Sequence, residues 1–232
     1  MTRPNPHRRF LLAYALANAG GVIAYSPLLM LLLPARIAVL AGPAQVEWLS
    51  LATLLGAITA SIAGVGFGWL SDLAGTRRTW VVAGLAATLA SYLPFALATT
   101  PAGLVAAVIA FQAAVNLLLA PLAAWAADAV PDRHKGVLSG LLGAGPPVGA
   151  LAGVVATLPL LAGEGARLAT VCAMVAALTV PLLFVRAPAR EDAPAALAVS
   201  APSRVAALSH WTETGPVSAA IRAGSSSVSS GV

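Results

Sequence analysis

Charged residues are scarce in this sequence, and their scarcity excludes a soluble protein. Only 9% of the 232 residues are Asp, Glu, Lys or Arg, whereas 59% are hydrophobic. A soluble domain covers its surface with roughly 25% charged residues. Lipid must therefore solvate most of this surface, and the composition predicts an all-α membrane protein.

Cysteine is nearly absent, since Cys172 is the only one in the chain. A single cysteine excludes an intrachain disulfide and a metal site built from cysteines. No histidine lies within a hydrophobic run, where it could act as a catalytic base, so no catalytic residue is expected. The net charge of +5 is small and its basic residues are dispersed, which argues against a nucleic-acid partner. We expect no cofactor and no metal.

Long hydrophobic runs separate the charges, and each is long enough to cross a membrane. A helix needs about 20 apolar residues for one crossing, because each residue rises about 1.5 Å. The third and fourth runs divide at Thr100 and Pro101, since a Thr cap followed by Pro is typical of a helix start. The predicted spans are six: 10–33, 48–70, 80–98, 102–127, 137–161 and 168–185.

The basic residues lie unevenly around these spans. With the N-terminus in the cytoplasm, Arg36 and Arg167 fall outside. The basic residues on the cytoplasmic side are then Arg3, Arg8, Arg9, Arg77, Arg78, Arg133, Lys135, Arg186 and Arg190. This positive-inside bias predicts that both termini are cytoplasmic. Because only one of the 13 basic residues is a lysine, we expect a multi-pass protein of a bacterial cytoplasmic (inner) membrane.

Composition divides the chain into three parts. Residues 1–9 form a short cytoplasmic N-terminus, and residues 10–186 form the six-helix transmembrane domain. Residues 187–232 are rich in Ala, Pro and Ser without apolar periodicity, which predicts a disordered cytoplasmic tail. A cleaved signal peptide is the alternative for the first span, but its apolar stretch exceeds the roughly 7–15 residues of such a segment.

The loop after the second predicted span carries a specific pattern, GWLSDLAGTRR. It resembles the signature loop between helices 2 and 3 of the major facilitator superfamily, G-x-L-[AS]-D-[RK]-x-G-[RK]-[RK]. Leu73 and Thr76 depart from that pattern by replacing basic residues. The residues that carry the resemblance or anchor the loop to anionic headgroups are Gly68, Leu70, Ser71, Asp72, Gly75, Arg77 and Arg78.

The resemblance implies the N-terminal six-helix half of a transporter, built as a 3+3 inverted repeat. Its function would be transport of a small solute across the bilayer by alternating access. Since the family fold pairs two such halves, we expect a truncated chain, one chain of a split transporter, or a half that forms a homodimer. The alternative is a membrane-embedded assembly or binding subunit without transport of its own.

Charges in the loop after the fourth span also resemble those of the family. They are Asp128, Asp132, Arg133 and Lys135. By resemblance, Asp72, Asp128 and Arg133 would form a cytoplasmic charge network that is remade during transport. The alternative is an incidental loop of solvated charges.

Small residues recur every four positions in the second and fifth spans. They include Gly56 and Gly64 in the second span, and Gly145, Gly149 and Gly153 in the fifth. Such stripes allow helices to approach closely in lipid. The resemblance implies that they face the second six-helix half.

Polar residues inside the spans are few. Asn18 and Tyr25 lie seven residues apart in the first span, and Gln112 and Asn116 lie four apart in the fourth, so each pair shares a helix face. The resemblance implies that these residues line a central substrate cavity. The alternative is that they form hydrogen bonds to neighbouring helices within the half.

Overall fold

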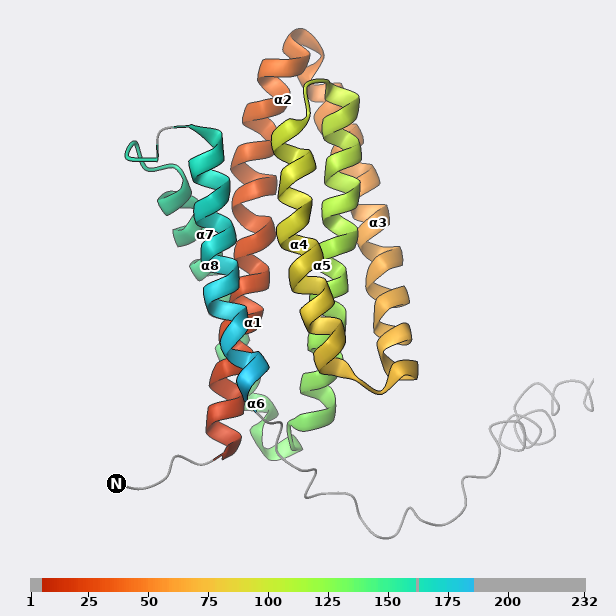
Figure 1. The fold of residues 1–232 in the computed structure, drawn as a ribbon, viewed down its shortest axis with the longest axis vertical. Coiled ribbons are helices and arrows are strands. Elements are labelled where there is room, and N and C mark those ends of the chain that lie inside the picture. The colour runs from red at the N-terminus through yellow and green to blue at the C-terminus, as the bar shows by residue number, and fades with distance from the viewer. Residues whose placement is uncertain (1–5, 162, 186–232) are drawn as a thin grey trace, which may run out of the picture. The chain divides into compact units, whose positions relative to one another are not determined.

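The computed structural model describes residues 6–161 and 163–185, and these residues form helices and no strand, as predicted (Figure 1). The predicted tail, 187–232, lies outside the described residues, as does most of the predicted N-terminal segment, 1–9. The elements are α1 (Pro6–Pro27), a π-helical turn η1 (Leu28–Leu32), α2 (Leu33–Ala41), a 3-10 turn η2 (Gly42–Ala44), α3 (Gln45–Ala74), α4 (Arg77–Leu97), α5 (Pro101–Ala129), α6 (Asp132–Leu142), α7 (Gly145–Ala156) and α8 (Glu164–Phe184).

Five helical segments among the described residues are long and apolar enough to cross a membrane. The first, Arg8–Ala74, is 67 residues long and contains α1, α2 and α3, so it exceeds the length of one crossing. The chain reverses direction between α2 and α3 (Figure 1), where Gly42 has a φ of 52° that favours glycine.

The first helical run is longer than the predicted span 10–33, because it continues through Pro34 and Arg36 to Ala41. Pro34 lies in the first turn of α2, directly after the π-helical turn η1, and the helical run continues through it. Arg36 finds acceptors on neighbouring helices, so a charge can remain within the helix.

The predicted span 137–161 also differs from the structure. Its helix begins earlier, at Asp132, and is interrupted at Gly143 and Ala144 before α7 continues to Ala156. Two consecutive prolines, Pro146 and Pro147, lack N–H donors and therefore fit only the first turn of a new helix.

The start of α5 agrees with its predicted cap. Thr100 has an extended backbone, and its hydroxyl accepts a hydrogen bond from the Gly103 N–H at 3.1 Å. Pro101 follows in the first helical position. The cap satisfies one of the free N–H groups at the helix start.

The helices pack around two central ones, α1 and α5. Helices α3 and α4 pack on α5, whereas α7 and α8 pack on α1; α1 also contacts α5, and α4 contacts α8. At the α4–α5 crossing, a side chain added to Gly84 would lie 2.5 Å from the backbone of Leu118. Glycine is therefore required for this close approach.

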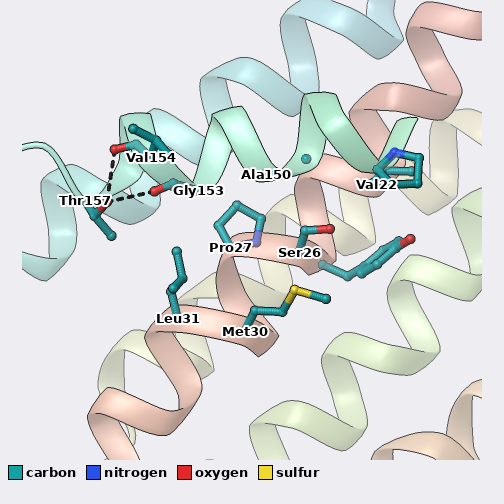
Figure 2. A pocket seen from close by; sticks show the side chains of 12 residues that line it. Val22, Ser26, Pro27, Met30, Leu31, Ala150, Gly153, Val154 and Thr157 are labelled. Atoms are coloured by element: carbon teal, nitrogen blue, oxygen red, sulfur yellow. Dashed lines mark hydrogen bonds between the residues drawn. The ribbon is translucent and has the colours of Figure 1, made fainter. Parts of the chain in front are cut away.

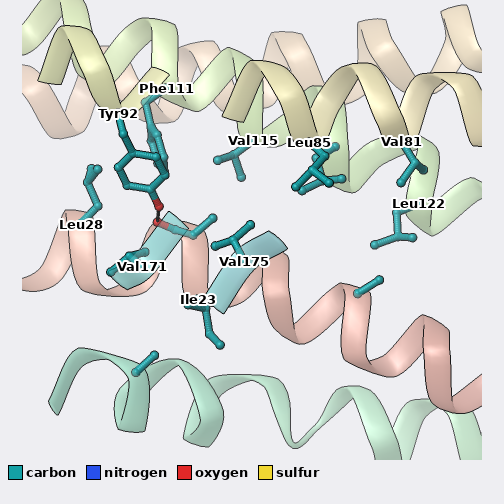
Figure 3. Packing of buried hydrophobic residues seen from close by; sticks show 14 of the residues in the cluster. Ile23, Leu28, Val81, Leu85, Tyr92, Phe111, Val115, Leu122, Val171 and Val175 are labelled. Carbon is teal, nitrogen blue, oxygen red and sulfur yellow. Dashed lines mark hydrogen bonds between the residues drawn. The ribbon is translucent and has the colours of Figure 1, made fainter. Parts of the chain in front are cut away.

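Buried aromatic residues join α1, α4 and α5 (Figure 3). The Tyr92 and Phe111 rings meet edge to face, with centroids 5.5 Å apart. The Tyr92 hydroxyl donates to the carbonyl of Ala24 at 2.6 Å. The Tyr92 hydroxyl thus has a hydrogen-bond acceptor, which the hydrocarbon of the lipid could not provide.

Candidate functional site

The signature loop is a tight turn between α3 and α4. Gly75 ends α3 in the left-handed conformation, with a φ of 65°, which supports the turn that the sequence predicted. Asp72 lies in the last turn of α3 and Arg77 is the first residue of α4. The turn therefore brings the carboxylate and the guanidinium to the same end of the bundle.

Arg77 connects three helix ends through one guanidinium. Its Nε and Nη2 contact Oδ2 of Asp128 at 3.0 and 2.8 Å. Its Nη1 pairs with Asp72 and donates to the Ser71 hydroxyl at 2.7 Å. We call Ser71, Asp72, Arg77 and Asp128 the Arg77 clasp. The planar fork of arginine presents several donors in fixed directions, which suits contact with both carboxylates at once.

The other loop residues lie around this clasp. The carbonyl of Gly68 accepts from the Ser71 hydroxyl at 2.8 Å, whereas Leu70 and Arg78 are exposed. Asp132 pairs with Lys135 within the first turns of α6. The base that contacts both Asp72 and Asp128 is Arg77, and Arg133 also has an interaction partner.

A pocket of about 450 Å³ lies between α1, η1 and α7 (Figure 2). We call it the α1–α7 pocket. It is lined by Val22, Tyr25, Ser26, Pro27, Met30, Leu31, Pro146, Gly149, Ala150, Gly153, Val154 and Thr157. The Thr157 hydroxyl already donates within α7, at 3.0 Å from its acceptors. The pocket is thus mainly apolar, with Tyr25 and Ser26 as hydroxyl groups on the α1 side, and its size suits a small solute.

The π-helical turn η1 forms one wall of this pocket. The N–H of Leu33 reaches back five residues to the carbonyl of Leu28. Such a widened turn shifts the following side chains around the helix axis and often occurs at functional sites. Pro27, which precedes it, and Met30 within it were not among the predicted site residues. In the sequence, the feature that could have indicated this turn is the pair of prolines on either side of it, Pro27 and Pro34.

The predicted cavity residues do not share one pocket. Tyr25 lines the α1–α7 pocket, whereas Gln112 lines a separate pocket of about 200 Å³ between α3 and α5. The Asn116 amide donates to the carbonyl of Gln112 at 2.8 Å. Asn18 lies at the α1–α7 contact, with Nδ2 3.7 Å from where a Gly145 side chain would begin.

The glycine stripes pack against helices of the same chain, which corrects the expectation that they face a second half. A side chain added to Gly56 would meet Val108 and Gln112 at 3.3 and 3.5 Å, and Gly64 faces Asn116. The fifth-span glycines face the first span, in the pairs Gly145 with Val22, Gly149 with Val22 and Ser26, and Gly153 with Leu31. These close approaches are already used for packing inside the bundle.

A second arginine, not predicted as a site residue, holds the opposite end of the bundle. Arg36 pairs with Glu164 at the start of α8. It also donates to the carbonyls of Ala96 and Ala98, at 2.8 and 2.7 Å, where α4 ends. We call Arg36, Glu164 and these two carbonyls the Arg36 clasp. An arginine inside an apolar helix was the sequence signal for it.

Comparison with known proteins identifies one family. A profile described as the Major Facilitator Superfamily matches residues 10–223. No curated protein and no solved structure matches the chain. Within the described residues, no group of three or more His, Cys, Asp or Glu could hold a metal ion.

Proposed function

The chain belongs to the major facilitator superfamily, and on this basis we propose that it carries a small solute across a membrane by alternating access. It is an integral, multi-pass membrane protein. In alternating access, one binding site opens in turn to each side of the membrane, through rocking of helix bundles around it. The solute site we propose is the α1–α7 pocket, with Tyr25 and Ser26 as its hydrogen-bonding groups.

We propose six crossings with both termini in the cytoplasm. The 67-residue first segment would cross twice, as α1 to α2 and then as α3, and the later segments would cross once each. The Arg77 clasp would then lie at the cytoplasmic face and the Arg36 clasp at the outer face. The excess of basic residues around the first of these faces supports this orientation.

The helix contacts support a 3+3 inverted repeat. In such a repeat, the first, second and third spans are equivalent to the fourth, fifth and sixth. The packing of α3 and α4 on α5 is then equivalent to the packing of α7 and α8 on α1. The α1–α5 and α4–α8 contacts map onto themselves. An inverted repeat places equivalent features at opposite membrane faces.

The two clasps follow the same equivalence. The Arg77 clasp joins the start of the third span to the end of the fourth, and the Arg36 clasp joins the end of the first to the start of the sixth. Arg77 corresponds to Glu164, and Asp128 to Arg36, with the signs of the charges interchanged. We propose that a second six-helix unit completes the solute path.

The Arg77 clasp is the observation that carries the proposal. Asp72 and Asp128 are about half exposed, at 57% and 52%, while Arg77 is 17% exposed. Solvated ion pairs of this kind contribute only about 0–1 kcal/mol each. The clasp can therefore form in one conformation and open in another without a large barrier. We assign Asp72 the role of a latch that biases this equilibrium.

The test is solute flux in vesicles. The purified chain, with its second unit where one is required, is reconstituted and challenged with labelled neutral, cationic and anionic solutes. We expect saturable uptake of one class, and a fall of up to about fivefold in turnover for Asp72→Asn, since a change of about 1 kcal/mol alters a rate by that factor. Glu47→Gln, an exposed carboxylate at the start of α3, is the matched control.

A normal turnover of Asp72→Asn would remove the latch. Absence of flux for every solute class, with a stable folded protein, would instead favour an assembly or binding subunit. In that case the partner would co-purify with the chain from native membranes.

A further inference from the structure

A second pocket, of about 410 Å³, lies beside the Arg36 clasp. Arg36, Glu164 and Arg167 form its polar side, and Leu32, Val39 and Leu40 form its apolar side. Val39 is 83% exposed, so the apolar side continues onto the surface of α2. The pocket therefore has a charged part at a helix end and an apolar part along a membrane-spanning helix.

The charges in this pocket do not balance. Two guanidinium groups meet one carboxylate, and Glu164 pairs with Arg36. Within residues 6–161 and 163–185, the Nε of Arg167 is buried and has no hydrogen-bond partner. A partly buried charge without a partner is costly, because water no longer solvates it fully.

We propose that this pocket binds a phosphate group, with Arg167 as its main ligand and Arg36 as a second. Guanidinium and phosphate match in geometry and form strong, charge-assisted pairs. The phosphate would supply the acceptor that the Nε of Arg167 lacks and offset the second positive charge. Because the pocket continues into an apolar surface, an anionic phospholipid fits it as a whole: headgroup at the helix ends and acyl chain along α2.

The test uses the purified full chain in detergent, with lipid retention measured by native mass spectrometry. Phosphatidylglycerol is the probe, phosphatidylcholine the zwitterionic comparison with no net charge, and inorganic phosphate the soluble competitor. We expect Arg167→Gln to weaken phosphatidylglycerol retention about tenfold, the effect of losing one charged hydrogen bond of about 1.5 kcal/mol. Arg9→Gln, an exposed arginine at the start of α1, is the matched control and should leave retention unchanged.

The outcomes separate the two sources of phosphate. Retention of phosphatidylglycerol that resists millimolar inorganic phosphate supports a lipid site. Stabilisation of the wild type by inorganic phosphate, lost in Arg167→Gln, supports a site for soluble phosphate. Equal losses in Arg167→Gln and Arg9→Gln, or no loss in either, would overturn the proposal.

Discussion

Two arginines fix the helix ends of this protein, and they do so with different partners. Arg77 lies between two half-exposed carboxylates and a serine hydroxyl, which are acceptors that water can replace. Arg36 lies between one carboxylate and two backbone carbonyls at the end of α4. Carbonyls at a helix end have no partner within their own helix, so their loss of a donor is harder to replace.

This difference predicts that Arg36 and Glu164 contribute unequally to the free energy of unfolding. Arg36→Gln should lower the free energy of unfolding by roughly 1–3 kcal/mol, because it strands two carbonyls and a carboxylate. Glu164→Gln should cost at most about 1 kcal/mol, because Arg36 keeps its carbonyl partners. Thermal unfolding in detergent measures both, with Glu47→Gln as the control; equal losses would show that the ion pair alone matters.

At the scale of single helices, the close crossings matter more than apolar contact area, because lipid is as apolar as the side chains it replaces. The α4–α5 crossing is one example, since the backbone of Leu118 would lie 2.5 Å from a side chain at Gly84. By contrast, Gly66 on α3 has open space around it.

Gly84→Ala should therefore destabilise the protein by roughly 1–3 kcal/mol, the usual cost of overpacking, by separating α4 from α5. Gly66→Ala should leave stability unchanged or raise it slightly, since alanine favours a helix more than glycine does. Denaturant unfolding of the two purified variants gives the comparison. A loss in Gly66→Ala as large as that in Gly84→Ala would contradict the packing argument.

Hydropathy predicted most of the helices but not their internal breaks. The cap at Thr100 and the turn at Gly75 follow from local preferences and were predicted correctly. The π-helical turn after Pro27 and the break before Pro146 depend on how the prolines fit neighbouring helices. Periodicity carries no information on that fit, because it depends on tertiary packing.

The candidate site shows the same limit. The signature pattern located Asp72 and Arg77, but the sequence could not show that Arg77 contacts Asp128 as well as Asp72. Small-residue spacing located the glycine stripes, but not the helices they face. A stripe looks the same in sequence whether its partner is an internal helix or another subunit.

At the scale of the whole molecule, the two clasps should lie on opposite sides of the membrane. A reporter inserted at Gly42–Ala44 should be active outside, and one fused after residue 190 should be active in the cytoplasm, because the positive-inside bias orients the spans. The side of the membrane is measured with two reporters, one active only in the cytoplasm and one active only outside it. A periplasmic signal after residue 190 would contradict the six-span topology.

Alternating access of the α1–α7 pocket is the central claim, and labelling of one engineered cysteine tests it most directly. Ser26→Cys, with Cys172→Ser to remove the native thiol, places a single reactive group in the pocket. The thiol is then titrated with a membrane-impermeant maleimide added to either side of oriented native membranes.

We predict that Cys at position 26 reacts from both sides, because the pocket opens in turn to each. Arg77→Lys should change the ratio of the two rates, since lysine lacks the planar fork whose nitrogens contact Asp72, Ser71 and Asp128. The matched change in the neighbouring residue, Arg78→Lys, should leave that ratio unaltered. Reaction from one side only, at a rate that neither substitution changes, would contradict alternating access.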